Sequence, residues 1–224
     1  MNAAWQFSQV SRQPYFRPLQ GLAAELQYMK QNESIIFDKL SYGDFAVAAA
    51  YTTIQAANGP VMLDEFAFGR KDANSVEEAG DYQSIPTHGS STQFVSYLKE
   101  RGFSDEEIVA LASVEAFGSV NDPKRAQLSS FPVLDNFYYK QLLTVSDKDA
   151  GSLPHYKELN SSQDLIQIVQ KYADSQGEYH KTFKQAFVKL CDIGYAYDDL
   201  EDIEGFLVDA PHKPMNVDGV QFQR

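Results

Sequence analysis

The hydrophobic positions of this chain repeat at helical spacing along most of its length. Leu19, Leu22, Ala23 and Leu26 fall at i, i+3, i+4 and i+7, which predicts a helix that ends near Asn32. No segment of convincing length alternates with a period of two, and we find no internal repeat. The pattern therefore predicts a mainly α fold. Further helices are expected from the Ser41–Asp44 pair to about Ala57, from Ser91 through Leu98, after Ser104 through Glu115, within 131–144, after Ser161 or Ser162 through Tyr172, and at about 177–193.

Capping residues mark several of the expected helix ends. Ser41 with Asp44, and Ser104 with Glu107, have the three-residue spacing of a capping box. Gly194 follows the last long helical pattern and predicts its end, because glycine adopts the left-handed conformation of a C-cap without strain. The other expected boundaries are the stop at Asn58-Gly59-Pro60 and a start at Ser161 or Ser162.

Three parts of the chain differ in pattern. Residues 1–18 carry Pro14 and Pro18 without periodicity and predict an irregular arm. Residues 19–194 form the helical body, in which 61–90 is expected to be a long loop packed on the helices. Residues 195–224 form an acidic and aromatic extension. These are the expected domain boundaries.

Composition describes a folded acidic protein. Of its 224 residues 43% are hydrophobic and 13% aromatic, and the formal charge is −12. That charge opposes binding to nucleic acid or to anionic lipid, which draws on Lys and Arg. It suits a basic partner surface or a cation-rich compartment and does not choose between them. The apolar stretch 45–57 is too short for a membrane span, so we expect no transmembrane segment.

Cysteine and histidine offer little chemistry. The single cysteine, Cys191, excludes an intrachain disulfide, and its apolar helical surroundings favour a buried core residue over a redox role. No histidine has the i, i+3 or i+4 spacing of a zinc or di-iron site. His180 is expected on the surface, and the other three are His88, His155 and His212.

The C-terminal extension interleaves carboxylates with aromatic and aliphatic residues. One interpretation is a solvated tail, and the other is a segment that docks on a basic partner surface. A calcium loop fits less well, because the spacing lacks the alternating Asp/Asn and central Gly of an EF-hand. The candidate docking residues are Tyr197, Asp198, Asp199, Leu200, Glu201, Asp202 and Phe206.

Six segments, in order, resemble the plant-type haem peroxidases, and especially the ascorbate peroxidase branch. The most informative is 102–118, whose frame is similar to the helix that carries the family's iron ligand. This resemblance implies a helical peroxidase-like fold, truncated on its N-terminal (distal) side. The remaining segments are Leu40–Phe45, Gly69–Asp72, Leu134–Tyr139, Leu153–Lys157 and Val169–Ala173.

The departures from the family's pattern fall on its chemistry. Glu115 stands where the resemblance places the iron-ligating His, and Tyr156 stands where it places the Asp that orients that His. The family's distal helix has no counterpart in the eighteen residues before Leu19. We therefore expect no catalytic site, no haem and no metal. We expect Glu115 to be a structural residue paired with Arg70 or Lys124, while a ligand role for Glu115 or His155 is a minor alternative.

These departures resemble those of the ascorbate-peroxidase-like protein of the thylakoid lumen. The resemblance implies a non-catalytic accessory subunit of a larger membrane-associated complex, with other protein subunits as partners. The expected setting is photosystem-associated and lumenal, and a mitochondrial respiratory complex is the alternative; no targeting segment is visible. Two further alternatives are a residual haem peroxidase and a module that holds a pigment, lipid or quinone in the vacated haem cavity. The larger groups Glu115, Tyr156 and Val114, in place of the family's His, Asp and Gly, indicate that this cavity is partly filled.

Overall fold

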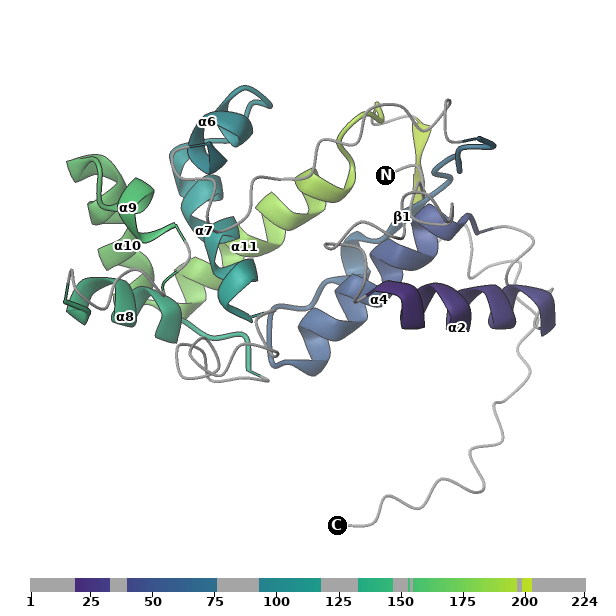
Figure 1. Cartoon of the computed structure of the whole chain (residues 1–224), viewed down its shortest axis with the longest axis horizontal. Coiled ribbons are helices and arrows are strands. Elements are labelled where there is room, and N and C mark those ends of the chain that lie inside the picture. The colour runs from purple at the N-terminus through teal and green to yellow at the C-terminus, as the bar shows by residue number, and fades with distance from the viewer. Residues whose placement is uncertain are drawn as a thin grey trace, which may run out of the picture.

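The computed structural model describes residues 19–32, 40–75, 93–117, 133–146, 153, 155–196 and 199–202 of the chain, and these are mainly helical (Figure 1). The predicted fold class is therefore confirmed. The helices are α2 (Leu19–Asn32), α4 (Tyr42–Ala56), α6 (Phe94–Lys99), α7 (Asp105–Phe117), α8 (Phe137–Thr144), α9 (Tyr156–Leu159), α10 (Gln163–Asp174) and α11 (Gln176–Cys191), with a 3-10 turn at Leu63–Glu65.

The predicted caps account for where these helices begin. Both halves of the Ser41–Asp44 capping box are present at the start of α4. At the start of α7, the Ser104 amide donates to Glu107 at 2.8 Å and Ser104 Oγ accepts from the Glu107 amide at 3.2 Å. Of the two candidates for α10, Ser162 is the cap.

Two starts differ from expectation. α11 begins at Gln176 because Ser175 caps it, and α6 begins at Phe94, later than the predicted Ser91.

The core is centred on α7, which packs against α11 and α10 (Figure 1). Residues 108–113 are consecutive and all buried, so this helix is enclosed on every side over nearly two turns. The tyrosines Tyr139, Tyr172 and Tyr179 surround it, with ring centroids 5.0–6.0 Å apart. Two of these contacts are edge-to-face and the third is tilted, and together they link α8, α10 and α11.

A short antiparallel ribbon joins two distant parts of the chain. β1 (Ala67–Phe68) pairs with β2 (Glu201–Asp202), with Ala67 opposite Asp202 and Phe68 opposite Glu201. The sequence predicted no strand here, because two residues are too few to show a period. The ribbon brings residues 199–202 of the expected extension onto the helical body.

None of the helices that the structure describes is both long and apolar enough to cross a membrane.

Candidate functional site

Glu115, the position that the resemblance assigns to the family's iron ligand, lies on the last turn of α7. The helix runs from Asp105 to Phe117 and so includes Glu115, but the side chain of Glu115 lies outside the described part of the structure. Val114, one residue earlier, is half-buried and packs against the core. Tyr156, to which the resemblance assigns the position of the family's orienting Asp, opens α9 and is likewise half-buried against the core.

His155 is the described histidine next to that position, and it is built into the core. Its ring stacks on Phe94 of α6 with centroids 3.9 Å apart and planes at 24°. Its Nδ1 lies 3.5 Å from Oε2 of Glu158, one turn along α9. The backbone of His155 is left-handed, with φ 55°, which is uncommon outside glycine. These contacts join α6 to α9.

His180 and Cys191, which are also of residue types that ligate haem iron, make contacts within the protein. His180 is half-buried rather than on the surface as predicted, and its Nε2 lies 2.9 Å from the Leu134 carbonyl. Cys191 is buried as predicted, and burial raises the pKa of its thiol to about 12. At neutral pH this group stays protonated and lacks the thiolate that ligates iron.

The buried phenols are protonated hydrogen-bond donors. The hydroxyl of Tyr139 donates to the carbonyls of Val109 and Ala110, each at 3.0 Å, and the hydroxyl of Tyr172 donates to the carbonyl of Glu106. Burial raises the pKa of Tyr139 and raises that of Tyr172 to about 12. The Cys191 thiol and the buried Tyr139 and Tyr172 phenols therefore do not offer the thiolate or phenolate that ligates haem iron.

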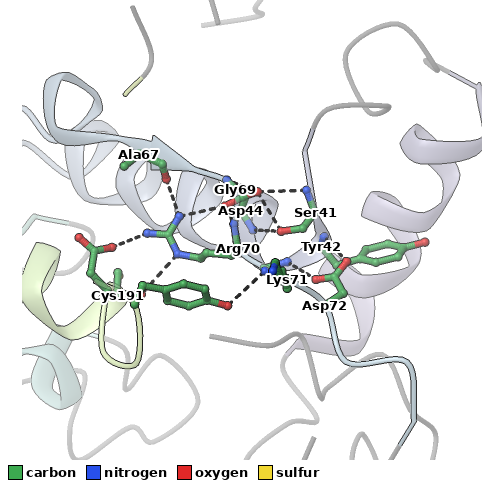
Figure 2. Close-up of polar contacts among 12 residues, drawn as sticks. Ser41, Tyr42, Asp44, Ala67, Gly69, Arg70, Lys71, Asp72 and Cys191 are labelled. Atoms are coloured by element: carbon green, nitrogen blue, oxygen red, sulfur yellow. Dashed lines mark hydrogen bonds and ion pairs between the residues drawn. The ribbon is translucent and has the colours of Figure 1, made fainter. Parts of the chain in front are cut away.

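The most extensive polar cluster lies instead around Arg70 (Figure 2). The guanidinium of Arg70 binds Oδ1 of Asp44 at 3.0 Å, and both side chains are almost fully buried. A second ion pair joins Arg70 to Asp192, just after α11. Arg70 thus connects α4 to the end of α11. The sequence analysis proposed Arg70 as an ion-pair partner of Glu115 and did not predict its pairs with Asp44 and Asp192.

Asp44 is the hub of this cluster. Its carboxylate accepts from the amide and hydroxyl of Ser41 and from the amides of Gly69 and Arg70, besides the guanidinium. The two carboxylate oxygens of Asp72 accept hydrogen bonds from the backbone amides of Tyr42 at 2.7 Å and Gly43 at 2.9 Å. These two amides lie in the first turn of α4, where backbone N–H groups have no partner within the helix and the helix dipole favours a negative charge. Residues of the Gly69–Asp72 motif therefore stabilise the start of α4.

The candidate docking residues lie beside the same cluster, as far as they are described. Asp199, Glu201 and Asp202 are exposed, whereas Leu200 is half-buried near Gly69. Asp199 accepts from the amide of Ala196 at 2.8 Å. Tyr197, Asp198 and Phe206 lie outside the described residues, as do residues 1–18, His88, Lys124 and His212.

Within the described ranges, no three His, Cys, Asp or Glu side chains gather as a metal site.

Comparison with known proteins agrees with the motif order. Residues 20–175 match the family described as Peroxidase. The chain is 27% identical over 161 residues to cytosolic L-ascorbate peroxidase 1 of Oryza sativa subsp. indica, covering 70% of this chain and 63% of that protein. It is 25% identical over 169 residues to cytosolic L-ascorbate peroxidase 2 of Arabidopsis thaliana, covering 72% and 64%.

Similarity extends to a plastid relative. Chloroplastic L-ascorbate peroxidase T of Arabidopsis thaliana is 25% identical over 191 residues, covering 75% of this chain and 44% of that protein. The chain thus spans less than two thirds of the length of these curated relatives.

Proposed function

Because this chain belongs to the peroxidase family, we propose that it is a member without catalytic activity that serves as a structural or accessory subunit of a larger protein complex. The observation that carries the proposal is the turn that opens α9. Where the family's pattern has an orienting carboxylate, this chain has Tyr156, half-buried against the core, and beside it His155 is held between Phe94 and Glu158.

The position of the iron ligand supports the same conclusion. Glu115 replaces the histidine in an otherwise similar frame. Known haem axial ligation uses His, Cys, Met or Tyr, so a carboxylate at this position does not substitute for the imidazole. When haem is bound in a peroxidase it supplies the redox chemistry, and the protein supplies the ligand and its orientation. Both protein contributions are replaced here by residues of different chemistry.

The proposed setting is a photosystem-associated complex in the thylakoid lumen, with a mitochondrial respiratory complex as the alternative. The resemblance to the lumenal ascorbate-peroxidase-like protein motivates it, and this is an argument by analogy. The partners would be other protein subunits of a membrane-associated complex. A net charge of −12 suits a basic surface on such a partner.

Native purification tests the subunit role. An epitope-tagged chain is isolated from organelle membranes in mild detergent, and its assembly size is measured by native gel and mass spectrometry. We expect a defined complex at constant stoichiometry that survives about 0.5 M salt, because salt at this concentration screens attraction between exposed charges and would release a partner held only by such contacts. A monomer with no stable partner contradicts the proposal. Mass spectrometry of small molecules in the same sample tests the pigment, lipid or quinone alternative.

A further inference from the structure

We draw no further inference here: the strongest candidate, the surface patch of exposed carboxylates on the 3-10 turn and the β1–β2 ribbon (Asp64, Glu65, Glu201 and Asp202), is a cluster of acidic side chains alone, and nothing in the described part of the structure shows what covers it.

Discussion

Asp44 is the residue on which most of the polar structure around α4 depends. Its buried carboxylate receives the Arg70 guanidinium as well as backbone and hydroxyl donors. Removing one member of a buried ion pair leaves an uncompensated charge, which usually costs more than the pair contributes against an apolar replacement. Asp44 should therefore tolerate change less well than any surface carboxylate.

Asp44→Asn is expected to lower the free energy of unfolding by roughly 3–5 kcal/mol, because it leaves the buried Arg70 with only the partly exposed Asp192 as a counter-ion among its described partners. The matched control is Asp64→Asn, which removes a pair with Lys184 in which the Asp64 side chain is 55% exposed. That change should cost less than about 1 kcal/mol. Urea unfolding of both variants checks the prediction, and similar losses would show that the Arg70 cluster does not stabilise the fold.

The buried thiol and phenol groups predict that the folded protein loses stability at alkaline pH. Burial raises the pKa of the Cys191 thiol from 9.0 to about 12, and it also raises the pKa of Tyr51, Tyr139 and Tyr179 above 10.0. Above pH 9 the unfolded chain releases protons that the folded chain retains, so the free energy of unfolding falls as pH rises.

Unfolding measured in urea at increasing pH should show a plateau below about pH 9 and a progressive decline above it. Cys191→Ser should remove the part of the decline that begins near pH 9 and leave the part that begins near pH 10, where the tyrosines ionise in the unfolded chain. An unchanged profile in this variant would mean that the thiol ionises alike in both states.

At the scale of elements, an aromatic contact joins α6 to the start of α9. α6 has six residues and α9 has four, so neither is stable alone and both depend on packing. The Phe94–His155 stack connects them, so this pair tests how much one aromatic contact contributes to holding α6 against α9.

A double-mutant cycle of Phe94→Ala and His155→Asn should give a coupling energy of about 1 kcal/mol, since stacked aromatic pairs contribute about 0.5–1.5 kcal/mol beyond their buried area. Asparagine is chosen because it tolerates the left-handed backbone at this position. The control cycle pairs His155→Asn with Asp64→Asn and should be additive. Additivity in the first cycle as well would show that the stack makes no specific contribution.

At the scale of the whole molecule, the sequence predicted the local features and missed the long-range ones. The capping box at Ser41 was predicted, and Ser162 was one of two predicted caps for α10, because cap and amide are three residues apart. The Arg70 cluster was missed because Asp44, Arg70 and Asp192 are far apart in the sequence, and no periodicity connects them. The β1–β2 ribbon was missed for the same reason.

The candidate site shows the same division. The resemblance proposed Glu115 and Tyr156 as positions of lost chemistry, which stays a prediction, and it gave no sign that His155 would stack on Phe94. Aromatic stacking across separate helices depends on tertiary packing, which a single sequence does not display. The docking role of the extension stays a prediction.

We propose that this chain of the peroxidase family does not hold a working haem. The most direct measurement is a titration of the purified chain with hemin, followed by dialysis and an absorption spectrum, with a cytosolic L-ascorbate peroxidase treated in parallel. We predict that the Soret band of this chain is lost on dialysis and that added hydrogen peroxide oxidises no ascorbate above the level of free hemin. A Soret band retained at one haem per chain, together with peroxide-dependent turnover, would contradict the claim and establish a residual peroxidase.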